Sequence, residues 1–274
     1  MSPFVALQRL LPHHLLSRSV GRLAASERAW LRDPLVRLFA RVYGVEMDEA
    51  ERTELASYRS FNDFFTRSLA EGARPIAPGV DAVASPADGV VSQAGTVADG
   101  HLIQAKGIRY SLEALAGSCA DPAFEGGPFC TVYLSPKDYH RVHVPLAGRL
   151  VRTEAIPGKL FSVNATTEAH VDGLFAVNER LACLFETEHG KVLAVMVGAL
   201  IVASIETVWD GPASPYRERV AVEHDRPFEK GEEMGRFLLG SSVVLAFERD
   251  RVTLDDAVAA GHTLRMGQAI GRAI

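Results

Sequence analysis

One serine of the sequence directly follows a glycine inside an apolar run. Ser241 follows Gly240, and Leu, Val and Phe dominate both flanks over residues 237–247. Such flanks predict buried strands, and a glycine within them commonly marks a bulge or a tight turn. The chemical alternative is a fixed hydroxyl beside an unhindered glycine carbonyl. That pair suits attack of Ser241 on its own preceding peptide bond.

Two histidines, His140 and His143, lie three residues apart beside an apolar segment. Residues spaced by three face opposite sides of a strand but share one side of a helical turn. The pair could therefore be two ligands or two groups with different tasks. The spacing does not match the usual zinc signatures and no third ligand is evident, so no metal site is predicted. Histidine instead suits general acid–base catalysis near neutral pH.

An aspartate, Asp88, lies in the sequence Ser-Pro-Ala-Asp-Gly at 85–89, whose structural interpretation is a hairpin turn. Asp, His and Ser also form the triad in which the carboxylate orients the imidazole and the imidazole takes the serine proton. A hydrolase would usually show a GxSxG motif around its serine. Here Ser241 follows Leu-Leu-Gly, which favours attack on its own backbone. A serine hydrolase that uses the same triad is the alternative.

The elements that must position these groups begin with an Arg-rich N-terminal region. Apolar and basic residues mix over 4–23 and 27–43, with breaks expected at Pro12 and Pro34. Residues 46–70 are also expected to be helical, with a second short helix rich in Phe over 60–67. Arg side chains beside an apolar face are typical of a helix that lies in the membrane interface. The alternative is a helical hairpin that packs on its own domain.

From about residue 80 the pattern changes to short Val-rich runs separated by Gly, Pro and Asp. This pattern predicts a mainly antiparallel β domain, sandwich or barrel-like, with few helices. The chain is thus predicted to be an α+β protein, with a helical membrane-associating region over 1–79 and a β-rich catalytic domain over 80–274. The Val-rich runs cover residues 90–91, 102–103, 129–134, 150–151, 181–185 and 192–197.

Net charge and cysteine content limit the classes of partner and the redox compartment that suit this protein. The net charge of −5 argues against general nucleic-acid binding, although residues 1–41 carry seven Arg against two acidic residues. The three cysteines are scattered and lack a CxxC motif, which argues against a disulfide framework and suits a reducing compartment. No N-terminal stretch resembles a cleavable signal peptide. The longest apolar run, 192–205, is too short to span a hydrocarbon core of about 30 Å.

Taken together, these motifs resemble the phosphatidylserine decarboxylases, which are pyruvoyl-dependent lipid enzymes. The resemblance extends from about residue 60 onwards, and one departure is Ser242, where the family usually has Thr. The matching segments are FNDFFTR at 61–67, ARPI at 73–76, SPADG at 85–89, YLSPKDYHRVHVP at 133–145, PGKLFSVN at 157–164, FAVNER at 175–180 and KGEEMGRFLLGSS at 230–242.

The resemblance implies a proenzyme that cleaves itself between Gly240 and Ser241 by serinolysis. Asp88 and His143 correspond to the partners of the serine in the family's triad. Ser241 would become a covalent pyruvoyl group, the cofactor of the mature enzyme. The larger chain, residues 1–240, and the smaller pyruvoyl chain, residues 241–274, would remain associated because their strands share one core.

The resemblance also implies the reaction of the mature enzyme. The serine amine of phosphatidylserine would form a Schiff base with the pyruvoyl carbonyl, carbon dioxide would leave, and phosphatidylethanolamine would result. His140 is the candidate donor of the proton that returns to carbon.

The resemblance places the protein peripherally at the cytoplasmic face of the cell (inner) membrane. Its expected partners are phosphatidylserine, an anionic membrane surface and a second copy in a homodimer, without nucleic acid. Two further alternatives are a zinc peptidase built on the histidine pair and a non-enzymatic membrane adaptor. The first lacks further ligands, and the second does not explain the Asp, His and Gly-Ser set.

Overall fold

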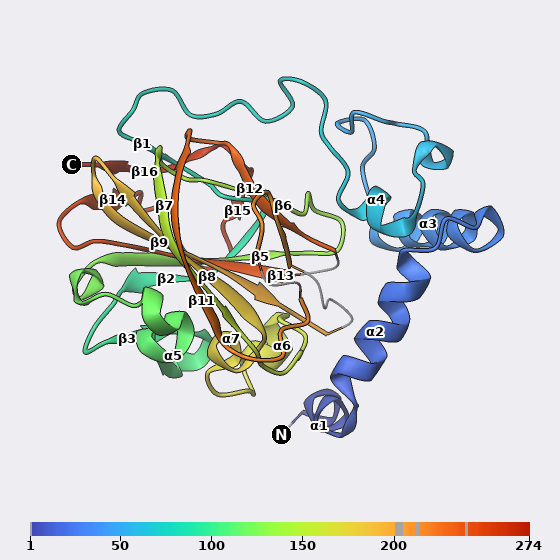
Figure 1. Cartoon of the computed structure of the whole chain (residues 1–274), viewed down its shortest axis with the longest axis horizontal. Helices are drawn as coiled ribbons and strands as arrows, with labels where there is room; N and C mark the ends of the chain where they lie inside the picture. Colours follow the sequence, from blue (N-terminus) through green and yellow to red (C-terminus); the bar gives the residue numbers. More distant parts are fainter. Residues whose placement is uncertain (1, 201–204, 212–213, 239–240) are drawn as a thin grey trace.

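The structure, a computed structural model, describes residues 2–200, 205–211, 214–238 and 241–274. Helices make up the N-terminal part, which lies to one side of a part built almost entirely from strands (Figure 1). The chain reaches the strands through a long connection between the last N-terminal helix and the first strand.

The N-terminal helices are α1 (Pro3–Leu10), α2 (His13–Ala24), α3 (Ala29–Tyr43) and α4 (Phe61–Phe65), with a 3-10 turn η1 (Leu55–Ser57) before α4. The predicted break at Pro12 is confirmed, because this residue separates α1 from α2. The predicted break at Pro34 is wrong, because α3 continues through it. Val36 and Phe39 of α3 pack against the phenylalanines of α4, and this packing outweighs the backbone hydrogen bond that Pro34 cannot donate.

The helical structure predicted before residue 60 is wrong, apart from η1, whereas the second short helix predicted over 60–67 is confirmed as α4. Residues 49–51 and 68–70 instead lie side by side, with Glu51 N donating to Ser68 O and Ala70 N donating to Glu49 O. The Arg52 guanidinium binds both carboxylate oxygens of Asp63, at 3.0 and 2.6 Å. These contacts fold the segment back on itself, which local helix preference could not reveal.

The α1–α2 corner is fastened to the strand-rich part by two buried polar side chains. The side chain of Gln8 accepts from Ser162 N at 2.8 Å and donates to Thr167 Oγ1 at 3.3 Å. His13 Nδ1 accepts from Leu160 N at 3.2 Å. The N-terminal helices therefore hold the loop that leads into the short helix α6 (Ala165–Glu168).

The strands form a large antiparallel sheet and three smaller sheets. The order in the eight-stranded sheet is β11-β7-β8-β9-β13-β5-β2-β15, and the smaller sheets are β1-β16-β14, β10-β12-β6 and β3-β4. The strands are β1 (Ala82–Ala84), β2 (Gly89–Thr96), β3 (His101–Ile103), β4 (Arg109–Ser111), β5 (Pro128–Leu134), β6 (Arg141–His143), β7 (Gly148–Ile156), β8 (Arg180–Thr187), β9 (Gly190–Gly198), β10 (Ile205–Thr207), β11 (Val220–Phe228), β12 (Glu233–Phe237), β13 (Ser241–Phe247), β14 (Val252–Leu254), β15 (Thr263–Leu264) and β16 (Ala269–Ala273).

The large sheet is covered on both faces. Along β13, Val243 and Leu245 belong to a core shared with the two three-stranded sheets that contain β1 and β12. Val244, between them, faces a second core that includes the short helices α5 (Leu112–Ala116) and α7 (Leu174–Val177). This alternation is the period-two pattern of a strand, and here both sides are apolar because both sides are covered. Short 3-10 turns, η2 (Ala105–Gly107), η3 (Gly117–Cys119) and η4 (Pro122–Phe124), complete the connections.

The predicted class is confirmed as α+β with mostly antiparallel strands and few helices. The Val-rich runs of the sequence lie in strands β2, β3, β5, β7, β8 and β9, as predicted. The barrel-like alternative is wrong. The described strands of the large sheet run from one edge, β11, to the other, β15, without closing.

Candidate active site

Ser241 is the first residue of β13, in the middle of the large sheet. It pairs with Leu134 of β5 on one side and with Gly198 of β9 on the other. Its side chain is fully buried, and its hydroxyl has no hydrogen-bond partner among the described residues. Gly240, the other half of the predicted cleavage site, lies outside the described residues. The hydroxyl of Ser242 is equally buried and equally unpartnered among the described residues, so burial alone does not distinguish Ser241.

His140 is fully buried at the entrance to β6. Its Nδ1 lies 2.8 Å from the carbonyl of Asp138, and because a carbonyl only accepts, Nδ1 carries the proton. Nε2 is therefore a lone pair, and it has no partner in the described part of the chain. The ring packs on Phe65 of α4, with 4.0 Å between ring centroids. Burial lowers the pKa of His140 to about 3, so the imidazole is neutral at physiological pH.

His143, three residues further on, has both nitrogens engaged. Nδ1 lies 2.8 Å from the carbonyl of Gly231, and Nε2 lies 3.1 Å from the hydroxyl of Tyr139. Burial lowers the pKa of His143, while the charges of Glu233 and Asp88 act in the opposite direction. The two histidines thus share a tautomer but differ at Nε2, which has no partner among the described residues in His140 and accepts from a phenol in His143.

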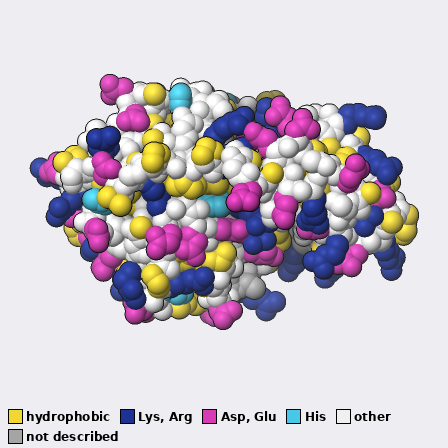
Figure 2. Space-filling view, turned by 90° about the horizontal axis from the view of Figure 1, so that it is seen from above, with side chains coloured by type: hydrophobic (Ala, Val, Ile, Leu, Met, Phe, Trp, Pro, Cys, Tyr) yellow, Lys and Arg dark blue, Asp and Glu magenta, His cyan; other side chains and the backbone are white. Residues whose placement is uncertain are grey.

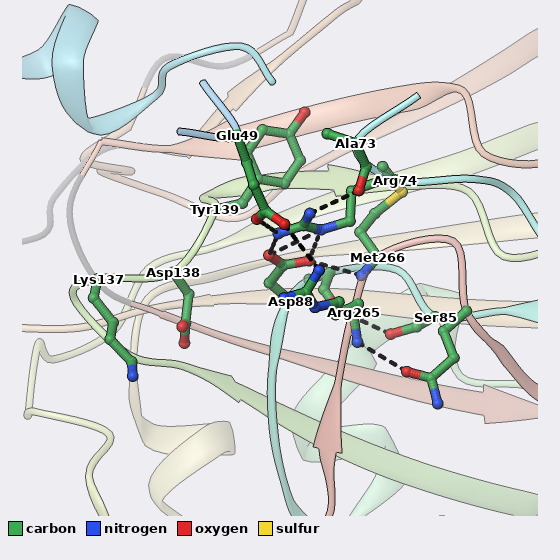
Figure 3. Close-up of polar contacts among 12 residues, drawn as sticks. Glu49, Ala73, Arg74, Ser85, Asp88, Lys137, Asp138, Tyr139, Arg265 and Met266 are labelled. Atoms are coloured by element: carbon green, nitrogen blue, oxygen red, sulfur yellow. Dashed lines mark hydrogen bonds and ion pairs between the residues drawn. The ribbon is translucent and has the colours of Figure 1, made fainter. Parts of the chain in front are cut away.

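Asp88 lies just before β2 and is held by an arginine (Figure 3). Arg74 donates to both carboxylate oxygens, at 2.9 Å from Nε and 2.6 Å from Nη2, and Met266 N donates at 2.8 Å. The hydrogen bonds of Asp88 raise the pKa of Arg74, so the guanidinium stays charged. Glu49 binds the same guanidinium at 2.9 Å. The carboxylate therefore binds Arg74 rather than either nitrogen of His143.

Backbone contacts bring the predicted residues to one end of the large sheet. His143 N donates to Pro86 O at 2.8 Å, which places β6 beside the Asp88 turn. Phe237 N donates to His140 O at 2.9 Å, shortly before the chain reaches Ser241. Gly89 makes the approach possible, because a Cβ there would lie 2.3 Å from the carbonyl of Tyr133. These contacts bring together three distant segments, which contain Asp88, the histidine pair and Ser241, but the Ser241 hydroxyl makes no hydrogen bond to either histidine.

A cavity of 580 Å³ opens in front of Ser241. The N-terminal helices supply one wall, including Phe4, Leu35 and Phe65. The strand-rich part supplies the other wall, including Ser162 and Ser241 itself. The lining is mainly apolar, as expected for a site that accepts hydrocarbon.

A second, polar pocket of 260 Å³ lies beside Asp88. Its walls include Arg74, Tyr139 and Lys137, and charged groups of both signs meet there (Figure 3). Arg67 also lines it and is buried, donating from Nη2 to the carbonyl of Lys137 at 2.9 Å. This contact fixes the loop that leads into His140.

Sequence reasoning missed Tyr139 and Arg74. Both lie inside segments recognised as motifs, 133–145 and 73–76, but neither residue type alone indicates a role. The roles of this buried phenol and this guanidinium follow from the groups that they contact. Only the folded structure shows those contacts. Among the described residues, no group of three or more His, Cys, Asp and Glu side chains is arranged to hold a metal ion.

The outer surface of the N-terminal helices is unusually apolar for a surface. Leu10 is 83% exposed, Trp30 72% and Val42 65%. On the face of this part that Figure 2 shows, Lys and Arg side chains lie among Asp, Glu and hydrophobic side chains. None of the described helices is both long and apolar enough to cross a bilayer.

Comparison with known proteins gives a consistent result. A family model described as phosphatidylserine decarboxylase matches residues 61–272, and a second model described as PSD matches residues 3–44. The chain is 50% identical over 279 residues to the phosphatidylserine decarboxylase proenzyme of Pseudomonas fluorescens, covering 98% of this chain and 96% of the relative. It is 50% identical over 279 residues to that of Azotobacter vinelandii, covering 98% of each chain. It is 49% identical over 276 residues to that of Shewanella sp. strain W3-18-1, covering 97% and 96%. These relatives give no support to the serine hydrolase alternative.

Proposed function

The chain belongs to the phosphatidylserine decarboxylase family and is a decarboxylase of phosphatidylserine. We propose that it is made as a proenzyme that cleaves itself between Gly240 and Ser241. One observation carries this proposal. Ser241 begins a central strand directly after Gly240 in the sequence, with a buried hydroxyl that has no partner among the described residues. The relatives, which are named proenzymes, agree with such processing.

In the proposed cleavage, His143 is the base. Ser241 Oγ loses its proton to Nε2 of His143 and bonds to the carbon of the preceding carbonyl. The peptide C–N bond then breaks and its nitrogen takes the proton, which leaves the two parts of the chain joined by an ester at Ser241 Oγ. Loss of the Cα proton of residue 241 to solvent and departure of the Gly240 carboxylate break this ester and leave a dehydroalanine. The dehydroalanine takes up water and releases ammonia to give the pyruvoyl group. Asp88 is bound to Arg74 and not to His143. It would therefore support the cationic form of His143 through its charge and not through a hydrogen bond. The two products stay together because β13 remains paired with β9 and β5.

A pyruvoyl group derived from Ser241 fits here, because Ser241 lines the mainly apolar cavity and its hydroxyl has no partner among the described residues that the conversion would break. The group supplies an electron sink for the pair left when carbon dioxide departs. His140 would handle the proton. Its Nε2 is a lone pair, so it must accept a proton, from the ammonium of the serine headgroup, before it can return one to carbon.

The apolar cavity would hold the part of the lipid next to its headgroup, and the exposed face of the helices would lie on the membrane. Leu10 and Trp30 would enter the interface, while Arg residues of the same helices would face anionic headgroups. We place the protein peripherally, at the cytoplasmic face of the inner membrane, where the anionic leaflet favours a basic segment.

A matched pair of serine variants tests the proposed cleavage. Ser241→Ala removes the nucleophile, so a denaturing gel should show one uncut chain. This variant should also lack decarboxylase activity. Ser242→Ala removes the neighbouring hydroxyl, equally buried and equally unpartnered among the described residues, and should be cut as the wild type is. Cleavage of Ser241→Ala, or its loss in Ser242→Ala alone, would assign the nucleophile to the wrong residue.

A further inference from the structure

The lone pair of His143 points at a phenol. Because Gly231 O can only accept, Nδ1 of His143 carries the proton and Nε2 accepts from the Tyr139 hydroxyl at 3.1 Å. The two rings are stacked, with centroids 5.7 Å apart and planes inclined by 29°. The atom that must take the proton of Ser241 is therefore already engaged.

The phenol is well placed to hold this contact. Tyr139 is 6% exposed, and burial raises its pKa to about 12, so the hydroxyl keeps its proton over the working pH range. Charged groups face the pair from each neighbouring element. They are Asp88 before β2, Arg141 on β6, and Glu233 and Arg236 on β12.

We propose that Tyr139 is a positioning residue of the self-cleavage, whose hydroxyl holds Nε2 of His143 and must release it before Ser241 can be deprotonated. The proposal rests on the proposed cleavage at Ser241. Two physical effects follow from the contact. It competes with Ser241 for the lone pair, and it stabilises the neutral imidazole, which makes His143 a weaker base.

Tyr139→Phe tests this, because it keeps the ring stack and removes only the hydroxyl. Precursor made by cell-free translation is transferred rapidly into buffers of different pH, and cleavage is followed on a denaturing gel. We expect the plateau rate to rise by about fivefold, the factor that one ordinary hydrogen bond is worth. We also expect the pH at half-maximal rate to move upward, because His143 becomes more basic.

Tyr110→Phe is the matched control. Tyr110 is similarly buried, at 5% exposed, but it packs on Phe175 in the other core. Its rate and pH profile should equal those of the wild type. If Tyr139→Phe matches the wild type in plateau and midpoint, or cuts more slowly at the plateau, the proposal is overturned.

A second readout does not depend on cleavage. In the uncut Ser241→Ala background, nitrogen NMR of His143 should report a proton on Nδ1, and Tyr139→Phe should raise the titration midpoint of the ring. An unchanged midpoint contradicts the proposal. Failure of the wild-type precursor to cut would instead remove the proposed function, so the two failures are distinguishable.

Discussion

The segment 133–145 separates two regions that differ in chemistry. On one side, Phe65 and Ser241 line an apolar cavity, and His140 packs on the ring of Phe65. On the other side, Asp88 and Arg74 form an ion pair in a polar pocket. One short stretch of chain therefore serves an apolar region and an ionic region.

The difference shows how two histidines three residues apart acquire separate tasks. Both carry the proton on Nδ1 through a backbone carbonyl, so both present Nε2 as a lone pair. For His140 that lone pair is vacant in the described structure, whereas for His143 it is covered by Tyr139. The surroundings of Nε2, and not the residue type, distinguish the proposed proton carrier of the decarboxylation from the proposed base of the self-cleavage.

The largest expected effect separates the two histidines directly. His143→Ala should leave one uncut chain with no decarboxylation, because the base of the cleavage is gone. His140→Ala should be cut normally but lose decarboxylation by about 10²- to 10⁴-fold, the usual contribution of a general acid–base group. A denaturing gel and release of labelled carbon dioxide measure the two steps. Normal turnover by His140→Ala would remove its role.

A second prediction concerns the ionic side alone. In the uncut Ser241→Ala background, Asp88→Asn should lower the free energy of unfolding by about 3 kcal/mol, because it leaves the buried Arg74 guanidinium underpaired. Glu49→Gln removes a more exposed partner of the same guanidinium, with 31% of its side chain accessible, and should cost about 1 kcal/mol or less. Urea unfolding measures both. Equal losses would mean that Asp88 is not the main partner.

These effects also show what could be predicted from the sequence. Ser241 and the histidine pair stand out by residue type and by position in apolar runs, and the alternating Val-rich runs predict the strands. The contact between Tyr139 and His143 could not be predicted, because it depends on how the 139–143 stretch folds. The contact between Arg74 and Asp88 could not be predicted either, because the two residues are 14 positions apart and no local sequence pattern relates them.

The errors in the helical region have a related cause. The first part of the helical structure expected over 46–70 does not form, because residues 49–51 pair with 68–70 and Arg52 forms an ion pair with Asp63. Pro34 was expected to break α3, but aromatic packing between Phe39 and α4 keeps the helix together. In both cases contacts between distant residues outweigh local preference.

The third prediction uses acid to test the burial of His140. Its folded pKa of about 3 lies below the unfolded value near 6.5, so the unfolded chain binds the proton first. Stability is therefore unaffected by this group above pH 6.5 and falls as the pH drops towards 3. In the Ser241→Ala background, His140 should lower the free energy of unfolding at pH 5 by about 2 kcal/mol relative to pH 7.

His140→Gln should remove this share of the acid sensitivity. Urea unfolding at pH 7 and pH 5 gives the comparison, with His101→Gln, on the exposed side of β3, as a control that keeps the wild-type slope. A His140→Gln protein with the same loss between the two pH values would show that the imidazole is not held neutral by burial.

The smallest expected effect concerns the membrane side of the cavity. Trp30→Ser combined with Leu38→Ser removes two side chains that are 72% and 61% exposed on α3. Binding to anionic vesicles should weaken about tenfold, from the apolar area that no longer enters the interface. Turnover of a soluble short-chain substrate should stay unchanged.

The matched control for the membrane prediction is Val80→Ser combined with Ile103→Ser. These apolar side chains are 82% and 40% exposed, but they lie outside the N-terminal helices. Vesicle binding by this variant should equal that of the wild type. If both double variants weaken binding alike, the membrane does not select the helical face.

The most direct test of the account is the intact mass of the purified protein under denaturing conditions. We predict two polypeptides, residues 1–240 and residues 241–274, with the smaller one carrying a pyruvoyl group in place of an amino-terminal serine. Active protein that consists of a single uncut chain with an unmodified Ser241 would contradict it.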